Sequence, residues 1–141
     1  MRRILYIIIL ALLFFAPVKR LDVAKLEPVQ TVAVYMQDDQ IVIETDTDNI
    51  GKGSTVHDAI DDLEQTTPGV IYLDTAEYLL LSKNAIIYID AIRQYLAQNV
   101  RVCLWDEEGS VKDAAKYLSV RKNLPKIKEI NENRLDNFSW N

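Results

Sequence analysis

The longest apolar stretch of the chain covers residues 4–18 and lies between the pairs Arg2-Arg3 and Lys19-Arg20. An apolar run that follows two arginines is typical of a secretion signal or a membrane anchor. A helix of 15 residues spans about 22 Å, which is less than the roughly 30 Å hydrocarbon core of a bilayer. Lys19 and Arg20 can reach the far headgroups with their long side chains, so the pattern predicts a hydrophobic helix that contacts the membrane through residues 4–18.

The apolar stretch is not followed by a good signal-peptidase site. A cut after Ala16 would place the bulky Phe14 where a small residue is required and would leave Pro17 directly after the cut. We therefore expect residues 1–20 to remain as a signal-anchor of a single-pass protein of the cell membrane, with the following domain outside the cytoplasm. If the leader is cleaved instead, the domain would be secreted.

Strand-like residues begin after a short tether at residues 21–30. Residues 31–36 and 41–45 are rich in Val, Ile, Thr and Tyr, which favours two strands, and the polar residues 37–40 between them favour a hairpin turn. Residues 46–53 contain many polar side chains and two glycines, and we expect a loop there.

A helical pattern follows this loop. Thr55 and Asp58 have the spacing of a capping box, and a stripe of apolar residues comes directly after the cap. The stripe consists of Val56, Ala59, Ile60 and Leu63. Two further strand-like runs at residues 70–73 and 78–81 come next.

The second half of the chain predicts two more helices around one strand. Ser82 can cap a helix that runs to about Ala97, and Ser110 with Asp113 has capping spacing for another helix. Between them, residues 100–105 form an apolar run typical of a buried strand. The buried stripes would be Ala85, Ile89, Ile92 and Leu96 in the first helix and Val111, Ala114, Ala115 and Leu118 in the second.

The order of these elements is β-β-α-β-β-α-β-α. It predicts one α/β (α+β) domain over residues 31–125, a small mixed sheet of about five strands with two to three helices, behind the N-terminal hydrophobic helix. Residues 126–141 are expected to be a C-terminal docking segment or a loose tail. Leu63, Ile89, Ile92 and Val102 should face one another in the core.

Charge divides the chain into two parts and excludes one class of partner. Residues 1–20 carry four basic side chains and no acidic one, whereas residues 21–141 carry 12 basic and 21 acidic side chains, a net charge of −9. An acidic body repels phosphate backbones, so we expect no nucleic-acid partner.

A phosphate-binding loop is suggested by the sequence Gly51-Lys52-Gly53-Ser54-Thr55 but is not supported by its spacing. A Walker A loop needs Ser or Thr directly after the lysine and a glycine where this chain has Asp46. A glycine-assisted turn into a capped helix accounts for the same residues, so no nucleotide or other cofactor is expected.

Three acidic residues, Glu44, Asp46 and Asp48, are weak candidates for a calcium site. In an EF-hand loop that began at Asp46, Ile50 would occupy a ligand position and His57 would stand where a bidentate glutamate belongs. The standard loop is thereby excluded, and the prediction is no metal site. A small secreted calcium-binding module, or a hydrolase that uses this acidic cluster, stays open as the alternative function.

The sequence gives little support for a nucleophilic catalytic site. Cys103 is the only cysteine, and it lies within an apolar run where cysteine packs as a small hydrophobe. The single histidine, His57, is expected in the first turn of a helix, with no nucleophile at a recognisable spacing. No catalytic residue is therefore assigned, and the chain is expected not to be an enzyme.

One set of structural residues within 51–118 carries a resemblance to a known family: Gly51, Gly53, Thr55, Ala59, Ile60, Leu63, Val70–Leu73, Tyr78–Ser82, Ala85, Ile89, Asp90 and Arg93. Through these residues, the range 51–118 resembles the N-terminal domain of Ger(x)C-type spore germination proteins and the related ring-building-motif modules of sporulation proteins. The resemblance implies an α/β module outside the cytoplasm of an endospore-forming Firmicute, in sporulation or spore germination. It assigns no catalytic residue.

These observations together predict a non-enzymatic, membrane-tethered interaction module. Its partners would be other envelope or spore proteins, or further copies of the chain in a homo-oligomer. Residues 31–36 are expected at an edge of the sheet, where unpaired backbone groups can accept a partner strand. Val32, Val34 and Tyr35 are the interface candidates.

Overall fold

The computed structural model describes residues 26–121 and 123–130, together with Ile4, Tyr6, Ile7 and Ala11. The hydrophobic helix predicted over residues 1–20 therefore lies almost entirely outside the described residues, as does the end of the predicted C-terminal segment. No helix within the described part of the chain is both long and apolar enough to span a bilayer.

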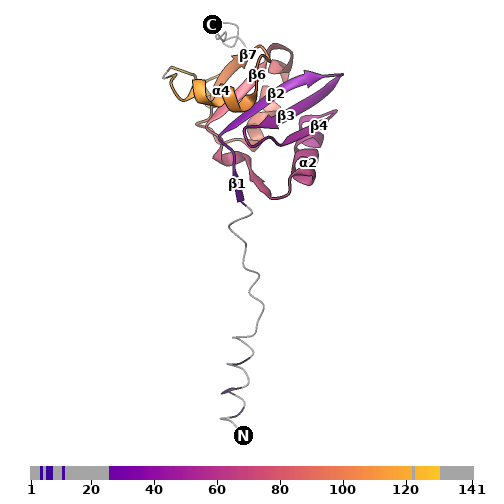
Figure 1. Cartoon of the computed structure of the whole chain (residues 1–141), viewed down its shortest axis with the longest axis vertical. Coiled ribbons are helices and arrows are strands. Elements are labelled where there is room, and N and C mark those ends of the chain that lie inside the picture. Colours follow the sequence, from indigo (N-terminus) through magenta and orange to yellow (C-terminus); the bar gives the residue numbers. More distant parts are fainter. Residues whose placement is uncertain (1–3, 5, 8–10, 12–25, 122, 131–141) are drawn as a thin grey trace.

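Five strands form the main sheet, in the spatial order β4-β3-β2-β6-β7 (Figure 1). Their bounds are β2 Thr31–Gln37, β3 Gln40–Thr45, β4 Ile50–Gly53, β6 Tyr78–Ser82 and β7 Arg101–Trp105. The pairs β2–β3 and β3–β4 are antiparallel, whereas β2–β6 and β6–β7 are parallel. This mixed five-stranded sheet with its helices confirms the predicted α+β fold.

The hairpin between β2 and β3 turns at two aspartates. Asp38 and Asp39 have φ angles of 50° and 60°, and Gln37 pairs with Gln40 across the turn. Positive φ at both central residues is the geometry of a two-residue turn whose twist matches that of the flanking strands. The predicted turn at residues 37–40 is thus confirmed.

A second, two-stranded parallel sheet joins β1 (Leu26–Pro28) to β5 (Val70–Tyr72). The prediction placed the residues of β5 in the main sheet and those of β1 in the tether over residues 21–30. The structure differs because β1 has a pairing partner and because Val29, only 1 % exposed, belongs to the core. The folded unit therefore reaches back at least to Leu26.

Residues 46–53 were expected to form a loop, but Ile50–Gly53 form β4, the fifth strand of the main sheet. Gly51 and Gly53 lie in β4 and are covered by helix α2 (Val56–Thr66), whose predicted Thr55 cap is confirmed by a 3.1 Å bond from the Asp58 amide. A Cβ atom on Gly51 would lie 2.2 Å from the carbonyl oxygen of Ala59. The glycines therefore allow the helix to approach the strand closely, rather than forming the expected turn.

The prediction of one continuous helix from Ser82 to Ala97 is wrong. The segment consists of the 3₁₀ helix Lys83–Tyr88, one α-helical turn, α3 (Ile89–Ile92), and the 3₁₀ helix Arg93–Tyr95. Ser82 makes no capping bond, and its buried hydroxyl has no hydrogen-bond partner among the described residues. Six of the 13 residues 83–95 are isoleucine or tyrosine, and β-branched and aromatic side chains disfavour a regular helix. Its predicted apolar stripe is nevertheless buried: Ala85, Ile89, Ile92 and Leu96.

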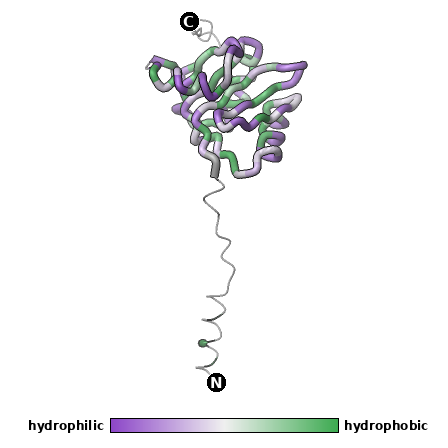
Figure 2. The backbone as a smooth tube through the Cα atoms, viewed as in Figure 1, coloured by the Kyte–Doolittle hydropathy of each residue, from purple (hydrophilic) through white to green (hydrophobic). Residues whose placement is uncertain are grey.

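Helices cover both faces of the main sheet. Helices α2 and α3 pack on one face, in a core that includes the four residues expected to face one another: Leu63, Ile89, Ile92 and Val102. On the other face lies α4 (Val111–Leu118), whose cap on Ser110 is confirmed by a 3.1 Å bond from the Asp113 amide. Figure 2 shows apolar stretches along the strands inside the domain and hydrophilic residues at the outer turns.

The segment that follows α4 returns to the sheet. Ile127 and Ile130 are buried in the core, and Arg93 donates a 2.9 Å hydrogen bond to the carbonyl oxygen of Ile130. Residues 126–130 thus pack on the domain. For these residues, the docking segment and not the loose tail describes the structure. The rest of that segment lies outside the described residues.

Candidate functional site

The interface expected at residues 31–36 is wrong, because β2 is the central strand of the main sheet. β3 pairs with one side of β2 and β6 with the other, so that its backbone is not free for a partner strand. Val32 and Val34 are fully buried, and only Tyr35 of the three candidates is partly exposed. The position of β2 at the start of the domain suggested that it would be an edge strand. In the structure, β6 pairs in parallel with the side of β2 that β3 leaves open.

The two true edges of the main sheet are each occupied in part. Along β4, the Lys52 amide donates to the Asp62 carboxylate at 2.8 Å, and the Thr66 hydroxyl donates to the Ile50 carbonyl at 3.2 Å. Along β7, the amide of Val102 donates to the Pro125 carbonyl at 2.9 Å. Edges blocked in this way resist strand addition. Strand addition at these positions is thus opposed by groups of the chain itself.

The three acidic candidates, Glu44, Asp46 and Asp48, serve separate structural contacts. Glu44 accepts a 3.0 Å bond from the Tyr35 hydroxyl, and burial together with this carboxylate raises the pKa of Tyr35 to about 12. Asp46 accepts from the amides of residues 30 and 31 at 3.1 and 3.2 Å. Asp48 lies 3.8 Å from the ammonium of Lys112. No group of three or more potential ligands suited to a metal ion occurs among the described residues.

These contacts make a specific prediction for calcium. Because the three carboxylates have different partners, 5 mM calcium chloride should change the thermal midpoint of the protein by less than about 1 °C, since only a ligand of the native state raises that midpoint. Scanning calorimetry with and without the ion measures this. The same scan with magnesium is the control, and a midpoint raised by several degrees with calcium alone would restore the calcium-binding alternative.

The two residues considered for nucleophilic chemistry lie apart. Cys103 is 2 % exposed on the sheet face under α4, and burial raises the pKa of its thiol. His57 is on the surface of α2, where Nδ1 lies 2.9 Å from the Tyr95 hydroxyl and Nε2 lies 3.4 Å from the Asp61 carboxylate. The structure therefore does not combine the thiol and the imidazole into a catalytic pair.

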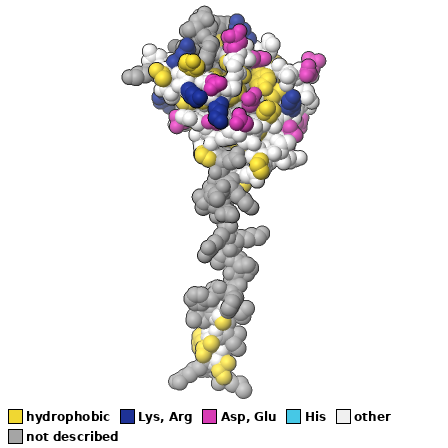
Figure 3. Space-filling view, in the orientation of Figure 1, with side chains coloured by type: hydrophobic (Ala, Val, Ile, Leu, Met, Phe, Trp, Pro, Cys, Tyr) yellow, Lys and Arg dark blue, Asp and Glu magenta, His cyan; other side chains and the backbone are white. Residues whose placement is uncertain are grey.

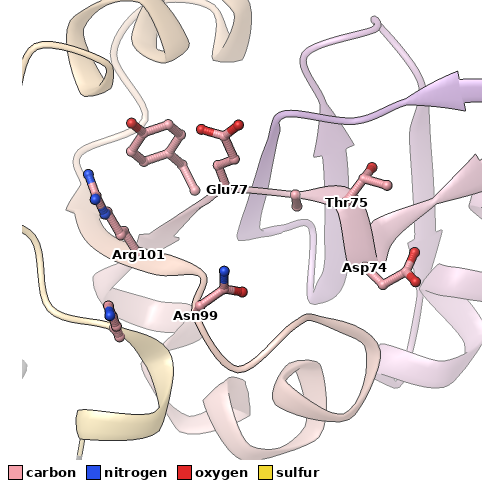
Figure 4. Close-up of a pocket in the computed structure, with 8 residues that line it drawn as sticks. Asp74, Thr75, Glu77, Asn99 and Arg101 are labelled. Atoms are coloured by element: carbon pink, nitrogen blue, oxygen red, sulfur yellow. The ribbon is translucent and has the colours of Figure 1, made fainter.

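A polar hollow of about 390 Å³ at one end of the main sheet is the candidate site (Figure 4). It lies where the parallel strands β6 and β7 begin, and its lining includes Glu77, Asn99, Arg101 and Lys126. Glu77 precedes β6, Arg101 opens β7, and Lys126 lies on the segment that returns after α4. In Figure 4, Asp74 also lines the hollow but points away from Arg101 and Glu77.

Backbone hydrogen bonds hold the walls of the hollow in place. The amides of Glu77 and Tyr78 both donate to the carbonyl of Gln30, at 2.8 and 3.1 Å, and the Arg101 amide donates to the Glu77 carbonyl at 2.9 Å. The Ile127 amide donates to the Val100 carbonyl at 2.7 Å. Four chain segments are thereby fixed side by side before any ligand arrives.

These residues are not among the candidates that the sequence indicates. Arg101 lies within the run 100–105 that predicts a buried strand, and Glu77 lies between the expected strands 70–73 and 78–81. A charged residue at the start of a buried strand is a weak signal on its own. Lys126 lies 25 positions further along the chain, and only the docking of its segment beside β7 brings it to Arg101.

Comparisons of the chain with protein-family models, with curated proteins and with solved structures gave no match. Figure 3 shows acidic and basic side chains interspersed with apolar ones on the face in view, without a continuous basic surface there.

Proposed function

We propose that this chain is a non-enzymatic interaction module, tethered to the cell membrane by residues 4–18, with its folded domain outside the cytoplasm. Its setting is the envelope of an endospore-forming Firmicute, in sporulation or spore germination, as the resemblance to Ger(x)C-type proteins implies. Its partners are other envelope or spore proteins or further copies of itself.

The observation that carries the proposal is the short distance in sequence between the apolar run and the folded domain. Seven residues separate Val18 from Leu26, the first residue of β1. Fully extended, this connection spans at most about 28 Å. A domain attached so closely stays within a few nanometres of the bilayer surface, where its partners would have to be.

Exposed apolar side chains next to β1 support the proposal that this end of the domain is near the membrane. Val70 is 50 % exposed and Tyr72 is 36 % exposed, and both lie on β5, the strand that pairs with β1. Alternate residues of a strand share a face, so these two side chains form a small apolar surface beside the point where the tether joins. Tyrosine is enriched where proteins meet the membrane interface.

Crosslinking in native membranes tests the interaction role. The full chain with a C-terminal epitope tag should give adducts of defined mass after treatment with an amine-reactive crosslinker. A matched control carries the same first 25 residues on an unrelated monomeric domain and should give none of these adducts. Identical patterns from the two proteins would contradict an interaction role for the domain.

The leader makes a separate prediction. Because no good cleavage site follows the apolar run, the protein isolated from membranes should retain residues 1–20, and carbonate washing should not release it. Intact-mass spectrometry of the native protein and fractionation of the cells measure both properties. A soluble species that starts near Val18 would show that the leader is a cleaved signal peptide.

A further inference from the structure

We propose that the polar hollow binds a small zwitterion, whose phosphate lies against Arg101 and Lys126 and whose primary ammonium lies against Glu77. The group is an ethanolamine phosphate, either free or as the headgroup of a phospholipid. The lipid source depends on the proposed membrane tether, whereas the site itself does not.

The first observation is the direct pairing of two cations. Arg101 and Lys126 are opposite each other in an antiparallel bridge. The hydrogen bonds from the Val102 amide to Pro125 and from the Ile127 amide to Val100 flank this pair. The two residues therefore form the non-hydrogen-bonded type of pair, in which opposite side chains are closest.

Two like charges directly opposite each other on paired strands are destabilising, and an anion between them would relieve the repulsion. Both side chains are half-buried, and neither forms an ion pair with a carboxylate of a described residue. A guanidinium offers a fork of N–H donors and an ammonium a point charge, a combination that suits the several oxygens of a phosphate. The pair thus favours a phosphate over a singly charged carboxylate.

The second observation is an acidic residue in the same hollow. Glu77 lies directly before β6, beside Arg101, and it too forms no ion pair among the described residues. A carboxylate only accepts hydrogen bonds, so it suits a primary ammonium and not a quaternary one, which has no N–H. A ligand with both charges is complementary to this lining, whereas a simple anion would be repelled by Glu77.

The size and the position of the hollow agree with this ligand. A volume of about 390 Å³ is within the usual range of small-molecule sites, roughly 300–1,000 Å³. The hydroxyl of Thr75, in the wall of the hollow, donates a 3.2 Å hydrogen bond to the carbonyl of Val29, so the hollow lies beside the end of β1. If residues 4–18 anchor the chain, the short connection to β1 would keep the hollow within a few nanometres of the lipid headgroups.

Calorimetric titration of the full chain in a maltoside detergent tests the site. O-phosphoethanolamine should bind saturably, and Arg101→Gln should weaken that binding at least tenfold. Glu77→Gln should weaken the binding of O-phosphoethanolamine but not that of inorganic phosphate. Lys83→Gln, which removes a charge beyond the other end of β6, is the matched control and should bind like the unchanged chain, with thermal midpoints confirming that every variant is folded.

A second experiment distinguishes a free ligand from a lipid headgroup. The titration is repeated with the chain in nanodiscs of phosphatidylethanolamine or of phosphatidylcholine. If the lipid headgroup fills the hollow, O-phosphoethanolamine binds at least tenfold more weakly in the phosphatidylethanolamine discs. Equal binding in both discs identifies a free ligand. No saturable binding in detergent, or equal binding by the unchanged chain and Arg101→Gln, would overturn the proposal. Binding by a protein that proves not to be membrane-bound would overturn the proposed function and leave the site intact.

Discussion

Replacing Gly51 by alanine is expected to lower the free energy of unfolding by about 3 kcal/mol, the upper part of the range for overpacked cores. The added Cβ atom would lie 2.2 Å from the Ala59 carbonyl oxygen and 2.5 Å from the Leu63 amide nitrogen. Both are backbone atoms of α2, so the helix has to move away from β4 as a whole. Urea unfolding followed by circular dichroism measures the loss.

The control for this substitution is the next residue of the same strand. Lys52 is exposed and points to the opposite face of β4, so Lys52→Ala should change the free energy of unfolding by less than about 0.5 kcal/mol. An alanine at Gly51 that is tolerated equally well would mean that α2 does not pack on β4 as described.

Truncation of Leu63 or Ile92 to alanine is the second large effect, with an expected loss of about 3 kcal/mol for each residue. Both side chains are fully buried in the core between the sheet and the helices. Their removal leaves a cavity that the packed surroundings fill only in part. A loss of this size is a large fraction of the stability of an ordinary domain.

Ile87 provides the matched control, because it is as large and apolar as Ile92 but 73 % exposed. Ile87→Ala should change the free energy of unfolding by less than about 0.5 kcal/mol. Losses below about 0.5 kcal/mol at both Leu63 and Ile92 would show that the predicted helix stripes face solvent and that the fold is wrong.

The fold was largely predictable where local chemistry decides it. The caps at Thr55 and Ser110 and the hairpin turn at residues 37–40 use only neighbouring residues, and all three are confirmed. The apolar stripes of α2 and α4 were also correct, because burial follows the period of a regular helix. The stripe expected between Ser82 and Ala97 is buried although its segment is not a regular helix.

Elements that depend on distant partners were not predictable in the same way. β4 contains two glycines, which are depleted in strands, and it forms because β3 and α2 enclose it. The central place of β2 requires β6 to pair in parallel on its far side, a pairing more than 40 positions away in sequence. The hollow brings Glu77, Arg101 and Lys126 together from three segments, and no local pattern marks such a set.

The most direct test of the proposed function is the accessibility of the domain to protease on intact protoplasts of an endospore-forming host. With a C-terminal epitope on the full chain, external proteinase K should remove the epitope while a cytoplasmic marker protein stays intact. The proposed function predicts this result, because residues 4–18 would then anchor the chain with its domain outside the cytoplasm. An epitope that survives until the membrane is permeabilised would place the domain inside and contradict the account.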